Sequence, residues 1–412
     1  MTEATVQAPE GWRAVPLADL ASFRTGPFGS TFHKSDYQSG GVPLINPSHI
    51  IDGEIVPDER VAVAPDLASR LSVFALREND IVIGRRGEMG RCAVVRSHTA
   101  GFLCGTGSMI VRPRPGVSPE LLQAFLASPK VVAKIEENSV GTTMINLNQG
   151  TLSSLEILLP DNDHGQQAIA AALSDADGVV AGLERVIAKK RLIKQGAMQD
   201  LLTARRRLTG FSGVWQSRPL SSVSSFITKG ATPTTYGFGW EAHGILFLRS
   251  ECVSSRGLDL SQSMFISEEA HRATKRSEVT SGDILITITG NVGRVIRLPN
   301  DFGQANINQH IARVRVNSGA AIPDFVFHQL SRPEYLRHFN SIVTGQAYPQ
   351  ISLQQVREAE VHFPEIDEQL AIAEFLNDMD AEIQTLETRL TKARAVKEWM
   401  MQNLLTGRVR LV

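Results

Sequence analysis

The feature that most constrains this chain is an internal repeat, in which the second half of the sequence resembles the first. A shift of 203 positions places residues 201–205 (Leu-Leu-Thr-Ala-Arg) on residues 404–408 (Leu-Leu-Thr-Gly-Arg) and Trp12 on Trp215. The same shift places residues 81–83, with the glycines that follow them, on residues 284–286 and their glycines. Solenoid repeats have periods of about 20 to 50 residues. The much longer period here predicts two copies of a whole folding unit.

Each copy consists of a mixed part followed by a helical part. In the mixed parts, short β-like runs (80–83, 108–111 and 283–287) and helix-like stretches (119–134 and 323–339) lie between Gly and Pro residues. The helical parts, about 45 residues each, contain no internal Pro, which would break a helix. We therefore predict an α/β fold with mixed domains at 1–160 and 210–364, and long helices at 161–209 and 365–412.

The helical parts carry apolar residues at alternating spacings of four and three, as the core positions of a coiled coil do. On each helix these residues form an apolar stripe, which we call the seam. The simplest partner for one seam is the seam of the other helix, so we expect the two helices to pack together. Lys190, Lys194 and Lys397 interrupt the seam at core-type positions, at a cost in stability. The predicted seam comprises Ile169, Leu173, Val180, Leu183 and Ile187 in the first copy, and Ile372, Leu376, Ile383, Leu386 and Leu390 in the second.

The composition excludes several classes of protein. The chain has 412 residues, with 42 Lys and Arg against 43 Asp and Glu, so a nucleic-acid binder would need its basic residues gathered locally. Cys92, Cys104 and Cys252 form no CxxC pair, which argues against a disulfide framework or a zinc finger. The first residues lack the basic and apolar regions of a secretory signal, and no apolar run approaches about 18 residues. We expect a cytoplasmic protein that does not span a membrane.

A search for catalytic motifs finds none. The chain lacks the GxxxxGK[ST] phosphate loop, the HExxH metalloprotease motif and the GxSxG nucleophile elbow. The segment 46–49 (Asn-Pro-Ser-His) lacks the second Pro and the aromatic residue of an adenine-methyltransferase motif, and we interpret it as a turn. A duplicated enzyme would show its motif twice, so a binding protein is favoured.

The order of a mixed domain, a long helix, a second mixed domain and a second long helix resembles the specificity subunit of type I DNA restriction-modification systems. Residues 363–369 (Phe-Pro-Glu-Ile-Asp-Glu-Gln) are similar to the segment that starts the family's helix. Asp80-Ile81 and Asp283-Ile284, each followed by two glycines, resemble its strand and glycine-loop element, and residues 230–234 its early turn. The first copy departs from this pattern, because residues 159–166 lack the Glu that precedes the Gln.

The resemblance implies a function for every part. Each mixed domain would be a target recognition domain that reads one half of a split double-stranded DNA sequence. The helices would form an antiparallel coiled coil that separates the readers. Two modification (methyltransferase) subunits would dock on it with S-adenosylmethionine, and ATP-dependent restriction subunits would complete the nuclease, with ATP and Mg on those partners. This chain would be non-catalytic and bind no cofactor or metal itself.

Base recognition in the major groove uses Arg on guanine and Asn or Gln on adenine. The two glycine loops differ in sequence between their shared positions, so the two half-sites should differ. The predicted DNA-binding residues are His33, Lys34, Arg85, Arg86 and Arg91 in the first copy, and Lys229, Thr232, Thr234, Arg249, Asn291, Arg294, Asn306, Asn308 and Gln309 in the second.

These residues also have simpler interpretations. An exposed Arg is commonly a solvated charge, and Arg91 and Arg294 are equivalent, so both could hold the loop instead of reading a base. Residues 305–311 alternate as a half-exposed strand does, and Trp12 and Trp215 are expected to anchor each domain core. Two further functions stay open, namely a coiled-coil scaffold that joins proteins without reading DNA, and an enzyme whose site is not recognisable from sequence.

Overall fold

A computed structural model describes residues 8–27, 34–137, 146–254, 257–345 and 348–411. The chain forms two compact units. The first unit comprises Met1–Glu184 together with Thr388–Val412, and the second comprises Arg185–Glu387. Each unit therefore contains one mixed domain, the helix part attached to it and the end of the helix that belongs to the other copy. The predicted class, mixed α/β with two tandem domains and two long helices, is confirmed.

The central sheet of each unit has the same strand order, which follows from the duplication. In both, the glycine-loop strand lies between a long strand and a short one, and every pairing is antiparallel. The order in the first unit is β2 (Ala21–Thr25), β11 (Ser108–Pro113), β8 (Ile81–Gly84) and β9 (Cys92–Val94). In the second unit it is β14 (Ser224–Lys229), β23 (Ile311–Val316), β20 (Ile284–Thr287) and β21 (Val295–Arg297).

A second small sheet carries further loops in each unit. In the first unit its order is β10 (Leu103–Cys104), β4 (Val42–Ile45), β7 (Ala62–Val63) and β3 (Tyr37–Gln38). In the second unit the order is β18 (Met264–Ile266), β15 (Ile245–Leu248), β22 (Ala305–Ile307) and β19 (Glu278–Val279). The pairs β4–β10 and β15–β22 are parallel. Two hairpins, β5 (Ile50–Ile51) with β6 (Glu54–Ile55) and β16 (Val253–Ser254) with β17 (Gly257–Leu258), complete these regions.

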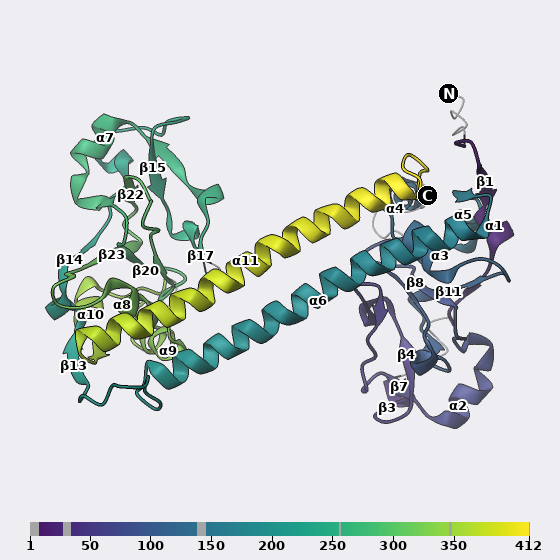
Figure 1. Cartoon of the computed structure of the whole chain (residues 1–412), viewed down its shortest axis with the longest axis horizontal. Helices are drawn as coiled ribbons and strands as arrows, with labels where there is room; N and C mark the ends of the chain where they lie inside the picture. The colour runs from purple at the N-terminus through teal and green to yellow at the C-terminus, as the bar shows by residue number, and fades with distance from the viewer. Residues whose placement is uncertain (1–7, 28–33, 138–145, 255–256, 346–347, 412) are drawn as a thin grey trace. The chain divides into compact units, whose positions relative to one another are not determined.

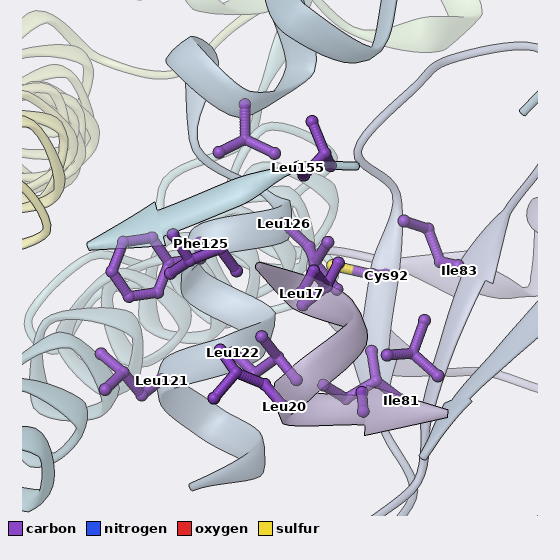
Figure 2. Close-up of a cluster of buried hydrophobic side chains, with 14 of the residues drawn as sticks. Leu17, Leu20, Ile81, Ile83, Cys92, Leu121, Leu122, Phe125, Leu126 and Leu155 are labelled. Atoms are coloured by element: carbon purple, nitrogen blue, oxygen red, sulfur yellow. The ribbon is translucent and has the colours of Figure 1, made fainter. Parts of the chain in front are cut away.

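Short helices cover the central sheets and form the cores with them. In the first unit, α3 (Pro119–Leu126) packs against β9, and its Leu122 and Leu126 side chains lie towards Leu17, Leu20 and Cys92 (Figure 2). The remaining short helices of this unit are α1 (Leu17–Leu20), α2 (Pro65–Arg70), α4 (Pro129–Glu137) and α5 (Gln149–Ser153). Those of the second unit are α7 (Glu268–Ala273), α8 (Pro323–Leu330), α9 (Pro333–Ser341) and α10 (Leu353–Arg357) (Figure 1). An outer strand pair joins the ends of each mixed domain, β1 (Trp12–Pro16) with β12 (Glu156–Pro160) and β13 (Gln216–Pro219) with β24 (Glu360–Phe363).

The two helix-like stretches predicted as continuous are each divided. Residues 119–134 form α3 and the start of α4, and residues 323–339 form α8 and most of α9. Pro129 and Pro333 stand at the first positions of the later helices. Proline supplies no N–H for a helical hydrogen bond and restricts the residue before it, so each stretch ends and restarts at that point.

The long helices are α6 (Asp163–Leu201) and α11 (Ile366–Leu404), and their ion pairs show that they run antiparallel within each unit. In the second unit Lys190 pairs with Glu382 at 2.7 Å, and Lys194 pairs with Asp380. In the first unit Arg394 pairs with Glu184 at 2.5 Å, and Lys397 pairs with Asp177. The core-type lysines therefore point to carboxylates on the facing helix.

The predicted seam residues differ in burial. Ile169, Leu173, Ile187, Ile372, Leu376 and Ile383 are buried, whereas Val180, Leu183, Leu386 and Leu390 are half-buried. The most buried ones belong to the cores of the mixed domains: Leu173 packs in the first core and Leu376 in the second. No helix among the described residues is long and apolar enough to cross a lipid bilayer.

Although residues 159–166 lack the Glu of the second copy, α6 still has a defined start. The Asn162 side chain accepts a hydrogen bond of 2.6 Å from the Gly165 amide, as a helix-capping residue does. Gln166 donates to the Pro160 carbonyl at 3.0 Å, and its equivalent Gln369 donates to Pro364 at 2.9 Å. The two long helices therefore begin with the same glutamine contact, and Asn162 caps the first of them.

Candidate nucleic-acid interface

The glycine loops connect the central strands β8 to β9 and β20 to β21. Their glycines have left-handed backbones, with φ of +80° at Gly90 and +86° at Gly293. A Cβ atom on Gly90 would lie 2.4 Å from the Val132 side chain, and one on Gly293 would lie 3.1 Å from Leu336. Both positions favour glycine because of their left-handed backbone, and at Gly90 the close approach of α4 adds a steric reason.

In the second unit, backbone hydrogen bonds gather five loops around β20. Ile288 donates to the His310 carbonyl at 2.9 Å, and Gly290 donates to the Pro349 carbonyl at 2.9 Å. Asn308 donates to Leu248 at 3.1 Å. We call residues 230–236, 248–252, 288–294, 308–310 and 348–351 the second loop cluster.

The first unit builds an equivalent arrangement with the same contacts. Arg85 donates to the Gly107 carbonyl at 2.8 Å, Leu147 donates to Arg85 at 2.9 Å, and Gly105 donates to Ile45 at 2.8 Å. We call residues 45–49, 84–91, 105–108 and 146–147 the first loop cluster. Residues 47–49 form a 3₁₀ turn within it, as interpreted from the sequence.

Four predicted side chains of the second copy are exposed on or beside this cluster. Asn291 and Thr234 lie on the loops themselves, and neither side chain has a hydrogen-bond partner among the residues that the structure describes. Gln309 is exposed and accepts a hydrogen bond from the half-buried Thr232 hydroxyl. Lys229 is exposed at the end of β14, immediately before the cluster.

Two arginines of the second cluster are partly engaged by the protein. Arg249 donates to Glu251 at 3.1 Å, and its side chain is 41% exposed. Arg294 donates to the Val253 carbonyl at 3.5 Å, while its own amide donates to the Thr287 hydroxyl at 3.0 Å. Both guanidiniums have further N–H groups beyond these contacts.

The structure corrects the prediction for Asn306 and Asn308. Asn306 is fully buried, and its amide nitrogen donates to Ser277 at 2.9 Å while its oxygen contacts the His271 ring at 2.6 Å. Asn308 is also buried, and its oxygen accepts from the His310 amide at 3.1 Å. Side chains that are buried and internally hydrogen-bonded cannot reach DNA, so we remove both from the candidate set. The alternation of residues 305–311 does not expose one face of β22, because Ala305, Asn306 and Ile307 are all buried.

The predicted arginines of the first cluster have three different environments. Arg86 is exposed, with no partner among the described residues. Arg85 is half-buried and donates to the Leu147 carbonyl at 3.0 Å and to Asn146 at 3.3 Å, and burial lowers the pKa of its guanidinium. Arg91 pairs with Glu88, with a nitrogen–oxygen distance of 2.7 Å. His33 lies outside the described residues, and of Lys34 only the backbone, in a 3₁₀ turn, is described.

Two residues in the clusters were not among the sequence candidates. Tyr348 is 67% exposed beside the glycine loop. Thr106 is the positional equivalent of Gln309 and lies half-buried in the first cluster. The sequence points to these two residues only indirectly. Tyr348 follows the turn at Gly345, and Thr106 is identified because the shift of 203 positions aligns it with Gln309.

A family model described as the type I restriction modification DNA specificity domain matches residues 9–190 and again residues 214–394. The chain belongs to this family. The two matches fall on the two copies found by the internal repeat. The chain is thus a DNA specificity subunit of a type I restriction-modification system, with its recognition domain duplicated. Members of this family are non-catalytic and work within the restriction-modification complex.

Curated specificity subunits are similar to the chain over nearly its whole length. The putative MjaX specificity subunit of Methanocaldococcus jannaschii is 23% identical, covering 98% of this chain and 95% of the relative. The EcoKI specificity subunit of Escherichia coli K12 is 22% identical over 98% and 89%. The S subunit structure from M. genitalium is 17% identical with a TM-score of 0.64, covering 98% of both chains. A second solved structure, described as the structural basis of complex assembly and conformational transition of the type I system, is 18% identical. It covers 98% of this chain and 100% of its own, with a TM-score of 0.58.

Two kinds of reactive site, a metal centre and a reactive thiol, are absent from the described residues of the specificity subunit. No group of three or more His, Cys, Asp or Glu side chains among those residues is placed to hold a metal ion. Burial raises the pKa of the Cys92 and Cys104 thiols to about 12, and also raises the pKa of Cys252. A thiol kept protonated is a poor nucleophile and a poor metal ligand.

Proposed function

We propose that the two loop clusters each read one half of a bipartite DNA sequence, with the α6–α11 helix pair fixing the gap between the halves. The observation that supports this proposal is a shared backbone with different side chains. Arg85-Arg86 in the first glycine loop corresponds to Ile288-Thr289 in the second, and Gly105-Thr106-Gly107 corresponds to Asn308-Gln309-His310. Readers with one scaffold and different surfaces would recognise different half-sites, so the whole site would be asymmetric.

The exposed side chains suggest how each cluster would contact DNA. Arg86 has the geometry for guanine, and the amides of Asn291 and Gln309 suit adenine. Lys229 and Thr234 would contact phosphates, which position the protein but carry no sequence information. Arg91 and Arg294 occupy equivalent positions and would contact phosphate or hold their loops, because a residue shared by two different readers cannot distinguish bases.

The helix pair is the proposed docking site for two modification subunits. Several apolar side chains on it remain exposed in each unit, among them Trp399 at 53% and Leu192 at 68%. Exposed apolar surface marks a protein interface where it is contiguous, so these side chains are candidates for the docking contacts. In the complex, the modification subunits would supply S-adenosylmethionine and the methyl transfer, and the restriction subunits would use ATP and Mg²⁺.

Selection from a random DNA library by the reconstituted complex tests this proposal. We expect an enriched sequence with two different specified halves and a constant unspecified gap. Recovery of a contiguous sequence would contradict the spacer role, and recovery of a palindrome would contradict two different readers.

The selection also separates this function from a scaffold that joins proteins without contacting DNA, because a scaffold would enrich no sequence. A second measurement, DNA binding as a function of salt concentration, would show no salt-dependent affinity for a scaffold. A DNA reader should show the steep decrease that accompanies release of counterions from phosphates.

A further inference from the structure

The internal repeat reveals a buried carboxylate in the second unit that the first unit lacks. Glu368, near the start of α11, is buried and receives two hydrogen bonds of 2.5 Å from the Arg207 guanidinium. Arg207 also donates to the Gly213 carbonyl at 3.0 Å, and its guanidinium lies 5.8 Å from the centre of the Trp215 ring. Glu368, Arg207 and Trp215 thus form one group of contacting side chains near the start of α11.

The first unit keeps the arginine and the tryptophan. The repeat places Arg410 on Arg207, Trp12 on Trp215 and Glu10 on Gly213. Arg410 donates to the Glu10 carbonyl at 2.7 Å, which is the equivalent of the Arg207–Gly213 contact. The repeat also places Gly165 on Glu368, so the side chain that would receive the other N–H groups of Arg410 is missing.

A pocket of about 140 Å³ is lined by Gly165, where that side chain would begin, and by Arg410, which is an exposed residue. Its lining includes Trp12, Pro160, Gly165, Ile169 and Arg410. The apolar members can contact methylene groups, and the guanidinium can receive a carboxylate in the bidentate geometry that Arg207 shows. Among the described residues, the Glu10 carbonyl is the one hydrogen-bond partner of Arg410.

We propose that this pocket binds a short carboxylate supplied by another molecule. The missing part of a glutamate, from Cβ to the carboxylate, has the structure of propionate. A free short-chain acid and the acidic side chain of a protein would present the same group. The first turn of α6, to which Gly165 belongs, adds a favourable partial positive charge. Glu10, an exposed acid, is also a lining residue of the pocket. Its negative charge would oppose the anion, so a Glu10→Gln change should strengthen binding.

The test is a titration of the full chain with propionate at constant ionic strength, followed by the NMR signal of the Trp12 indole N–H. We expect a saturable shift of that signal, no comparable shift of Trp215, and no response to the neutral isostere propionamide. Arg410→Ala should abolish the shift. Equal responses to propionate and propionamide, or an unchanged response in Arg410→Ala, would overturn the proposal.

A variant that fills the pocket from within gives an independent test. Gly165→Glu places the missing carboxylate beside Arg410, and Gly165→Ala is the matched control, because a Cβ here would lie 3.1 Å from the Asn162 side chain. We expect Gly165→Glu to lose the propionate response and to melt at a higher temperature than Gly165→Ala. Retention of the full response in Gly165→Glu would contradict the assigned position.

A third measurement distinguishes the two sources of the carboxylate. A capped tripeptide with a central glutamate is titrated in parallel with propionate. A saturable Trp12 shift from the peptide assigns the pocket to an acidic protein side chain, and a response to propionate alone assigns it to a free acid. If neither ligand shifts the signal, the pocket does not bind carboxylates. Carboxylate binding at this pocket would be independent of DNA readout.

Discussion

The Asp80 carboxylate receives two hydrogen bonds of 2.7 Å from the Arg112 guanidinium. Asp283 and Arg315 form the same pair with the same distances in the second unit. Both aspartates are almost fully buried, and each also caps the turn before its strand: the Arg77 amide donates to Asp80, and the Thr280 amide to Asp283. This explains why the repeat contains Asp-Ile at the start of each glycine-loop strand.

Replacing Asp80 with Ala should lower the free energy of unfolding of the first unit by about 3 kcal/mol, because it leaves a partly buried guanidinium without its partner. Denaturation monitored by hydrogen exchange of the β8 and β11 amides measures this effect. Replacing both residues, as in Asp80→Leu with Arg112→Met, should recover part of the loss. A loss well below about 1 kcal/mol for Asp80→Ala would show that the pair contributes little.

The lysines in the helix seam lead to a second prediction. Lys194 pairs with Asp380 in the second unit, and the repeat-equivalent Lys397 pairs with Asp177 in the first. Lys194→Glu should lower the melting temperature of the second unit because two acids would then face each other. Adding Asp380→Lys should restore it by reversing the pair. If the double variant is no more stable than Lys194→Glu alone, the lysine does not act through Asp380.

Much of this fold could be predicted because its information is local or repeated. The heptad spacing predicts both long helices, and the shift of 203 positions predicts two equivalent units. The glycines of the two loops identify the same turn in each copy. Each of these signals is visible within a short window of sequence or by comparing the two copies.

The features that could not be predicted depend on contacts between distant residues. Arg112 lies 32 positions from Asp80, and no local pattern links them. Asn306 is a predicted base contact because its amide suits adenine, but His271 and Ser277 come from other elements to bury it. Arg85 and Arg86 are adjacent in sequence, and only the approach of residues 146 and 147 gives them different environments.

This difference predicts separate effects for the two arginines on DNA binding. Arg86→Ala should weaken binding to one half-site by about 1 to 3 kcal/mol if the side chain reads a base, while the chain's stability is unchanged. Arg85→Ala should affect the same half-site but also loosen residues 146 and 147, visible as faster hydrogen exchange. Gel-shift assays with each half-site mutated in turn measure both. Equal loss on non-specific DNA would show that Arg86 contacts phosphate instead.

The buried thiols predict slow chemical modification. Because burial raises the pKa of Cys92 and Cys104 to about 12, both remain protonated at pH 8 and neither is accessible to reagent. The native chain should therefore react with a thiol-specific reagent far more slowly than the chain in denaturant, where free cysteine has a pKa of about 8.5. Rapid modification of Cys92 in the native protein would show that α3 separates readily from the central sheet.

His328 predicts how the second unit responds to acid. Its ring is buried between α8 and α11 and contacts Asn377 at 2.8 Å, and burial lowers the pKa of the ring. The unfolded chain, where histidine has a pKa of about 6.5, then binds a proton more readily than the folded chain. Stability should therefore fall as the pH decreases below about 6.5. His328→Gln, which keeps an amide donor for Asn377, should reduce the difference in melting temperature between pH 7.5 and pH 5.5. The matched control His338→Gln, at an exposed position on α9, should leave that difference unchanged, and an equal reduction in both variants would contradict the assignment to His328.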